Sequence, residues 1–316
     1  MPNQFKLKQK KMFELYEQQK YPEVNAIVAE MMKEFPGKRG LLYNVAYCVQ
    51  SATGNSERAL ELMEEAADKG YWSDPDQLIT DNDLKPLWNE PRFKSVAERF
   101  RLLAKEYSKS NPARLEVLKP DGFNPGDRHA VPLIIALHGN TQSIEDSRND
   151  WGFMAKKGWL VALPQSSQAS MEGAFVWNNF ETAIPEIKEH FKELTKNYDI
   201  DSERIIIAGF SMGGALAASI CFNQVIPCNK FILMGPYIQN ASVFAESLEV
   251  LGRKDGHGYI LVGENDTGCL QGSKDLAALC KEHRVECELD VIPGIGHEFP
   301  DNFQTLVSNA LARFDR

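Results

Sequence analysis

The sequence predicts an α/β protein with a mostly parallel sheet and helices on both faces, preceded by an all-α helical-repeat-like domain. Residues 1–107 show helical spacing of apolar residues and almost no strand pattern. From residue 113 onward, short apolar runs alternate with amphipathic segments. Strands separated by helices form a mostly parallel sheet that is covered on both sides. We therefore expect a helical domain over 1–107, a linker at 108–112 and a sheet domain over 113–316.

The helical domain has three apolar stripes at i, i+3, i+4 spacing, over 24–35, 41–49 and 59–66. The first and third stripes superimpose at an offset of 35 residues, so that Val24 corresponds to Ala59 and Met31 to Ala66. This offset is close to the 34-residue tetratricopeptide period. The region resembles a degenerate tetratricopeptide array, with a plain helical bundle as the alternative.

Seven apolar runs in the second domain have the length of buried strands. They are 115–118, 133–137, 160–163, 205–208, 231–234, 259–262 and 289–292. The segments between them, of which 181–194 is an example, are predicted helices. Ligands of such sheets bind at the carboxyl ends of the strands. Residues with reactive side chains directly follow several of these runs.

Composition and charge narrow the class of protein. The formal net charge of −9 disfavours a nucleic-acid partner, because phosphates would be repelled. No apolar stretch is long enough to span a bilayer, and the first residues lack a signal-peptide core. The six cysteines show neither a CxxC pair nor zinc spacing. We expect a cytoplasmic protein with reduced thiols and no bound metal.

The segment Gly209-Phe210-Ser211-Met212-Gly213 carries the strongest chemical signal. It follows the apolar run 205–208 and precedes the small-residue stretch 214–218. This pattern predicts a strand, a sharp turn and a helix, with Ser211 exposed at the apex, as a nucleophile requires. Glycines flank the serine because larger residues would collide across so tight a turn.

A serine nucleophile needs a base, and the base needs an acidic partner. Among the six histidines, His297 lies in a glycine-rich loop after the last strand, at the expected end of the sheet. Asp266 and Glu264 both follow the run 259–262. Asp266 is favoured because it lies further into its loop, whereas Glu264 is assigned to capping or fixing that loop.

Backbone amides are the expected donors to the oxyanion. One is the amide of Met212, at the start of the helix that follows Ser211. The other is the amide of Asn140, since Gly139 lets the backbone approach closely. His138, at the end of the run 133–137, is assigned to packing or to fixing this loop.

Residues 113–316 resemble an α/β-hydrolase of the esterase, carboxylesterase or phospholipase-like group. The resemblance rests on the segment 199–204 leading into Gly209–Gly214, and on the chain order Ser211, Asp266, His297. Trp177 is similar to a pocket aromatic residue of these esterases, although a core tryptophan explains it equally well. The resemblance implies hydrolysis of a carboxylic ester through an acyl-enzyme, without a metal or organic cofactor.

The connections 165–180 and 235–255, the latter with Tyr237, are expected to shape the pocket together with His138 and Gly139. Neither connection is a long apolar lid, so a small, soluble ester is the favoured substrate. A peptidase or thioesterase of the same superfamily, and a non-enzymatic scaffold, remain as alternatives. The helical domain is expected to bind a protein partner, to self-associate or to wall the active-site entrance.

Overall fold

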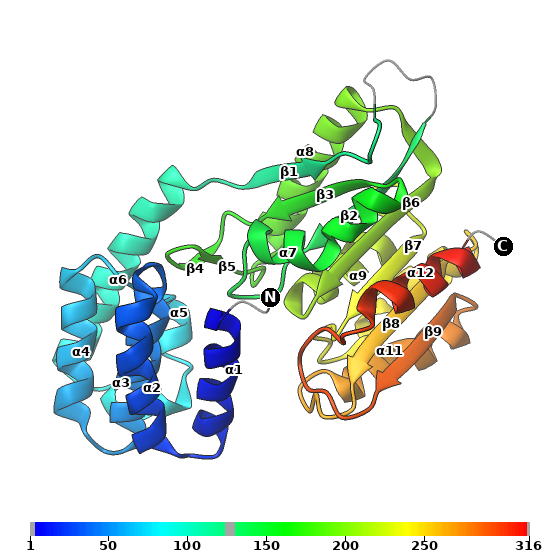
Figure 1. Ribbon diagram of the computed structural model, residues 1–316. Coiled ribbons are helices and arrows are strands. Elements are labelled where there is room, and N and C mark those ends of the chain that lie inside the picture. Colours follow the sequence, from blue (N-terminus) through cyan, green and yellow to red (C-terminus); the bar gives the residue numbers. More distant parts are fainter. Residues whose placement is uncertain (1–3, 124–129, 315–316) are drawn as a thin grey trace. The chain divides into compact units, whose positions relative to one another are not determined.

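The computed structural model describes residues 4–123 and 130–314 and contains two compact units (Figure 1). The first unit is Met1–Asn111 together with Ala169–Ala174, and the second is Pro112–Gln168 together with Phe175–Arg316. None of the helices in the described ranges is both long enough and apolar enough to cross a membrane.

The first unit is helical, as predicted, apart from the short segment contributed by residues 169–174. Its helices are α1 (Gln4–Glu17), α2 (Tyr21–Glu34), η1 (Pro36–Lys38), α3 (Arg39–Ala52), α4 (Ser56–Asp68), α5 (Pro75–Leu78), η2 (Asn82–Leu87) and α6 (Pro91–Ser110). The apolar stripes form its core: Val24 and Met31 of α2 are buried, as are their counterparts Ala59 and Ala66 of α4. Burial of these stripes stabilises helices whose individual propensities would not suffice.

Two features of this unit differ from the sequence pattern. Helix α6 continues to Ser110, so the predicted linker 108–112 begins inside a helix. Strands β4 (Ala169–Met171) and β5 (Ala174–Phe175) form a small hairpin in the connection 165–180, which carried no strand signal. Most of this hairpin belongs to the helical unit: the Tyr107 hydroxyl accepts a hydrogen bond from Gly173 N at 3.0 Å.

The second unit contains the seven predicted strands in one sheet. They are β1 (Arg114–Leu118), β2 (Val131–Leu137), β3 (Leu160–Gln165), β6 (Ile200–Phe210), β7 (Lys230–Met234), β8 (His257–Gly263) and β9 (Glu286–Ile292). Their order is β1-β3-β2-β6-β7-β8-β9; β1 pairs antiparallel with β3, and all other pairs are parallel. After β3 the chain crosses to the far side of β2 to form β6. Ligand sites form at such a switch point.

Helices cover both faces of the sheet, which confirms the predicted fold class (Figure 1). The elements are α7 (Ile144–Trp151), η3 (Gly152–Lys157), α8 (Phe180–Asn197), α9 (Met212–Phe222), η4 (Ala241–Phe244), α10 (Ala245–Gly252), α11 (Leu270–Glu282) and α12 (Phe303–Phe314). Alternate residues of β2 face opposite layers: Ile135 belongs to the core cluster that includes residues of α8, α9, α10 and α11, whereas Ile134 belongs to the cluster that includes residues of α7 and α12.

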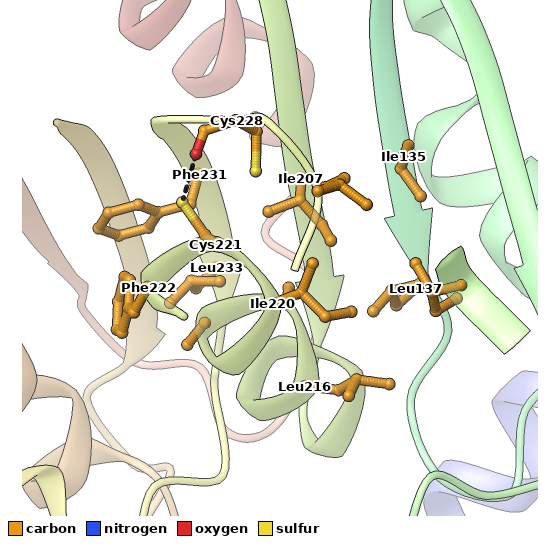
Figure 2. Packing of buried hydrophobic residues seen from close by; sticks show 14 of the residues in the cluster. Ile135, Leu137, Ile207, Leu216, Ile220, Cys221, Phe222, Cys228, Phe231 and Leu233 are labelled. Atoms are coloured by element: carbon orange, nitrogen blue, oxygen red, sulfur yellow. Dashed lines mark hydrogen bonds between the residues drawn. The ribbon is translucent and has the colours of Figure 1, made fainter. Parts of the chain in front are cut away.

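Helix α9 is buried all round, which explains the small, apolar residues that follow Ser211. Leu216 and Ile220 of this helix belong to the same buried cluster as Leu137, Ile207 and Leu233 of the sheet, and Figure 2 shows Ile220 next to Leu137 and Ile207. Because its packing leaves little freedom, α9 fixes the position of the turn that precedes it.

Candidate active site

Ser211 lies at the apex of the turn between β6 and α9. Its φ of 56° and ψ of −122° belong to a sparsely populated region that costs a non-glycine residue about 1–3 kcal/mol. Ser211 N donates to the Met234 carbonyl at 3.0 Å, and the Ser211 carbonyl accepts from Tyr237 N at 3.0 Å and Ala215 N at 3.1 Å. The strained conformation is therefore held by the backbone of β7, α9 and the segment after β7.

Close backbone contacts explain the glycines of this turn. A Cβ on Gly209 would lie 2.3 Å from the Gly213 carbonyl oxygen, and a Cβ on Gly213 would lie 2.1 Å from the carbonyl oxygen of His138. Contacts this short are sterically forbidden. The turn thus packs backbone to backbone against the loop after β2, which brings the loop that contains Asn140 to the serine turn.

His297 and Asp266 lie side by side after β9 and β8, respectively. His297 Nδ1 is 2.6 Å from Asp266 Oδ2, a distance typical of a charge-assisted hydrogen bond. Asp266 is 4% exposed, and its Oδ1 accepts from Cys269 N at 3.2 Å. A buried carboxylate at Nδ1 favours the tautomer that leaves Nε2 as a hydrogen-bond acceptor.

Aromatic and backbone contacts place this pair beside the serine turn. The ring of Phe210, the residue before Ser211, stacks on His297 with centroids 4.6 Å apart and an interplanar angle of 26°. Gly235, which follows β7, has a φ of 47°, and a Cβ there would lie 3.1 Å from Asp266 Oδ2. Residues from β6, β7, β8 and β9 therefore meet at one edge of the sheet.

Glu264 makes a different contact from Asp266. It is exposed, and its Oε2 accepts a hydrogen bond from Gly294 N at 3.1 Å. Gly294 belongs to the loop that carries His297 and has a φ of 74°. Glu264 therefore tethers that loop, and Asp266 is the carboxylate that reaches the imidazole.

The loop after β2 contains one backbone amide that is bonded within the protein and one that is not. Gly139 N donates to Gln142 Oε1 at 2.8 Å, and a Cβ on Gly139 would lie 2.7 Å from Phe210 Cδ1. Asn140 Oδ1 accepts from Trp177 N at 2.9 Å. Among the residues that the structure describes, neither the backbone N–H of Asn140 nor that of Met212 donates a hydrogen bond. These two amides are thus available to a ligand, whereas that of Gly139 is occupied.

His138 and Trp177 support this loop from within the protein. His138 is 1% exposed, its ring stacks on Trp177 with centroids 4.6 Å apart, and its carbonyl accepts from Trp177 Nε1 at 2.9 Å. Burial lowers the pKa of His138 to about 4. Nδ1 lies 2.7 Å from the Gly139 carbonyl oxygen, which identifies it as the donor of a neutral ring. Neither side chain has the exposed surface needed to line a pocket.

Tyr237 differs from the other predicted pocket residues because its side chain is 38% exposed. Its hydroxyl accepts from Gln239 Nε2 at 2.7 Å, and its backbone N holds the Ser211 carbonyl. Among His138, Gly139, Trp177 and Tyr237, only Tyr237 has an exposed side chain.

Sequence reasoning did not identify Gln142, Asn178 and Phe210 as contributors. Gln142 fixes Gly139, Asn178 Oδ1 accepts from Asn140 Nδ2 at 2.6 Å, and Phe210 stacks on His297. An aromatic residue inside the Gly-x-Ser-x-Gly segment was visible in the sequence, but its partner was not. Gln142 and Asn178 carried no recognisable motif.

Comparison with known families agrees with this fold. A profile described as "A/B hydrolase-like, N-terminal domain" matches residues 5–106, and one described as "Serine aminopeptidase, S33" matches residues 128–257. The first covers the helical region and the second covers the segment from the Asn140 loop through the Ser211 turn. The N-terminal region is thus A/B hydrolase-like, and the sheet unit has the α/β-hydrolase fold.

Two curated relatives match part of the chain. The bifunctional acetylxylan esterase/xylanase XynS20E of Neocallimastix patriciarum is 28% identical over 40% of this chain and 19% of its own length. YitV of Bacillus subtilis (strain 168), named as a candidate esterase, is 33% identical over 28% of this chain and 38% of its own length. The matched part of the chain thus spans about a fifth of the length of the first relative and less than two fifths of the length of the second.

Two solved structures resemble the protein. An uncharacterized protein from Bacillus cereus ATCC 10987 is 28% identical with a TM-score of 0.58, and the match covers 98% of each chain. The esterase PE8 is 16% identical with a TM-score of 0.52 over 65% of this chain and 99% of its own. The first similarity extends over both units, and the second concerns the fold of the sheet unit alone.

Proposed function

We propose that this protein is a serine hydrolase that cleaves a small, soluble carboxylic ester. The observation that carries the proposal is the 2.6 Å contact between His297 Nδ1 and Asp266 Oδ2, beside a serine held at φ 56° between a strand and a buried helix. The names of the two curated relatives, which include esterase functions, support an ester as substrate.

The proposed reaction assigns one role to each of these groups. Ser211 Oγ attacks the ester carbonyl while His297 Nε2 takes its proton, and Asp266 stabilises the imidazolium. The amides of Asn140 and Met212 donate to the oxyanion. The imidazolium then protonates the leaving alcohol, and a water molecule activated by His297 releases the acid from Ser211.

Substitution of Ser211 tests this proposal. Ser211→Ala is expected to lower kcat on p-nitrophenyl acetate by about 10⁴-fold or more, and to abolish labelling by a fluorophosphonate probe. Ser308→Ala, which changes a hydroxyl on α12 that bonds Gln304 O, serves as the matched control and should keep both. Unchanged turnover in Ser211→Ala, with labelling retained, would remove Ser211 from its role.

A peptidase is the second candidate, because the profile that matches residues 128–257 is described as a serine aminopeptidase. The same serine, histidine and oxyanion donors serve amide, ester and thioester cleavage. A panel of matched acyl p-nitrophenyl esters, thioesters and p-nitroanilides ranks these substrates by kcat/KM. We expect the esters to rank first; higher values for the anilides would assign peptidase activity instead.

We further propose that the helical unit resembles tetratricopeptide repeats and binds a protein partner or a second copy of the chain. The buried stripes of α2 and α4, offset by 35 residues, support the repeat. Sedimentation velocity of the purified chain tests self-association.

The six unpaired cysteines, five of them buried, support a cytoplasmic location.

A further inference from the structure

Three atoms of different metal-ligand chemistry converge at the proposed active site. Cys269 Sγ lies 3.7 Å from His297 Nδ1, which lies 2.6 Å from Asp266 Oδ2. The sulfur, the nitrogen and a carboxylate oxygen all lie within 4.8 Å of one another. The hydrolytic mechanism uses the nitrogen and the oxygen but gives the sulfur no role. We propose that Asp266, Cys269 and His297 bind a zinc ion, and that this binding reversibly inhibits hydrolysis.

The distances suit tetrahedral zinc. With Zn–S of about 2.3 Å and Zn–N of about 2.0 Å, tetrahedral angles place sulfur and nitrogen about 3.5 Å apart. The observed Sγ–Nδ1 distance is 3.7 Å. The carboxylate oxygen and Nδ1 must separate from 2.6 Å to about 3.3 Å. The metal would therefore replace the Asp266–His297 hydrogen bond, and these two atoms would move apart by about 0.7 Å.

Local backbone structure holds two of the ligands in place. Cys269 N and Leu270 N both donate to the Asp266 carbonyl, at 3.2 and 2.9 Å, so the turn 266–269 presents carboxylate and thiol together at the start of α11. Both side chains are almost fully buried. The His297 side chain is 39% exposed, which leaves a solvent-facing side where water can complete the coordination.

The charges of the donor set also favour a divalent ion. A carboxylate and a thiolate together neutralise Zn²⁺, so that no net charge is buried. Thiolate, imidazole and carboxylate are all established zinc ligands. Calcium and magnesium prefer oxygen ligands alone, so a set with sulfur and nitrogen disfavours both ions. Zinc is therefore the cation that fits this set best among common divalent ions.

Metal binding would change the tautomer of His297. The thiol releases its proton to solvent as the Zn–S bond forms, and the Nδ1 proton moves to Nε2 by exchange with water, so one proton leaves per zinc bound. An imidazole with its proton on Nε2 can no longer accept a proton from Ser211. This inhibitory step rests on the proposed function, whereas metal binding itself does not.

Cobalt(II) tests the binding step without any substrate. Titration of the full-length protein with Co²⁺ is expected to give one equivalent of binding with near-ultraviolet thiolate-to-cobalt charge-transfer absorption. Cys269→Ala and Cys269→Ser should lose this absorption and weaken Co²⁺ and Zn²⁺ binding by at least about tenfold. Cys287→Ser, which removes the partly exposed thiol on β9, should behave as the wild type.

Inhibition is measured on the same proteins. Zn²⁺ should suppress ester hydrolysis by the wild type and by Cys287→Ser, and EDTA should restore it. Turnover of each protein with Zn²⁺ is divided by its own turnover without metal, because Cys269 Sγ lies 3.7 Å from His297 Nδ1 and its replacement can change the basal rate. This ratio should fall for the wild type and stay near one for Cys269→Ser. Absence of thiolate absorption, or equal metal affinity in Cys269→Ala, would overturn the site. Binding through Cys269 without loss of turnover would overturn the inhibition.

Discussion

Asp266 and Glu264 both follow β8, yet their side chains contact different groups. Asp266 reaches His297 Nδ1 at 2.6 Å, whereas Glu264 holds Gly294 N at 3.1 Å. Only the first contact can fix the imidazole tautomer and stabilise the imidazolium. The second holds the loop on which His297 lies. The two carboxylates thus offer a comparison within one loop.

Asp266→Asn is expected to lower kcat by about 10⁴-fold, because an amide cannot stabilise the imidazolium and favours the wrong tautomer. Glu264→Gln keeps an acceptor for Gly294 N and should cost less than about tenfold. Steady-state kinetics on p-nitrophenyl acetate, with thermal unfolding as the check on folding, measure both. Similar losses in the two variants would contradict the assignment of Asp266.

His138 makes stability depend on pH, because burial lowers its pKa to about 4 from an ordinary value of 6.5. Between these pH values the unfolded chain binds a proton at His138 that the folded protein excludes, so stability decreases as pH falls. The loss reaches about 3 kcal/mol at most near pH 4. His138→Asn retains a donor for the Gly139 carbonyl but does not titrate. Urea unfolding at pH 7 and pH 5 should show a smaller drop for this variant, and parallel drops would contradict the prediction.

At the scale of elements, the site depends on the contact between the serine turn and the loop after β2. The contact requires Gly213, whose added Cβ would lie 2.1 Å from the His138 carbonyl oxygen. That loop also carries Asn140, so the same contact positions the serine relative to one of the two amides that we propose as oxyanion donors. Two rigid pieces of backbone therefore define the geometry, with little contribution from flexible side chains.

Gly213→Ala is expected to push the two segments apart and to lower kcat by at least about 10²-fold, the effect of losing one oxyanion donor. Gly214→Ala is the matched control, since its nearest contact would be Pro236 Cα at 3.1 Å, and it should be much milder. Kinetics and thermal unfolding are measured together. Equal turnover in the two variants would show that the contact with His138 is not needed for catalysis.

At the scale of the whole molecule, the chain leaves the sheet unit at Ala169 and returns at Phe175. The six residues between belong to the helical unit, where Met171 and Ala174 are buried and Gly173 N bonds the Tyr107 hydroxyl. The returning strand then supplies Phe175, whose carbonyl accepts from Thr141 N at 2.8 Å. Residues 169–174 of the helical unit are therefore followed directly in the chain by Phe175, which holds the loop that contains Asn140.

Removal of residues 1–111 deprives this segment of its packing. We expect the fragment 112–316 to be cut after Glu172, which is exposed in the hairpin, at least about tenfold faster than the intact chain, because loops without buried contacts open locally. Cleavage by a glutamate-specific protease, followed by mass spectrometry, measures the rates. The full-length Tyr107→Phe variant, which loses the hydrogen bond from Gly173 N, should be cut at an intermediate rate. Equal cleavage of fragment and intact chain would contradict the assignment of this segment.

The predicted strands, the helical first region and the strand–turn–helix around Ser211 all rest on local rules. Alternating apolar runs, helical spacing and glycines in a tight turn constrain the backbone over a few residues, so the amino-acid order alone reveals them. The structure confirms the fold that these rules predict. The position of His297 after the last strand likewise follows from the order of strands in a parallel sheet.

Other features arise from contacts between residues distant in the chain. The sheet order brings Asp266 rather than Glu264 to His297, places Gln142 on Gly139 and sets Cys269 Sγ beside the imidazole. The assignment of residues 169–174 to the helical unit has the same origin. Each depends on the direction of a side chain or the path of a loop after packing, and no local pattern encodes those directions. Local sequence therefore specifies which groups are available, and tertiary packing decides which of them meet.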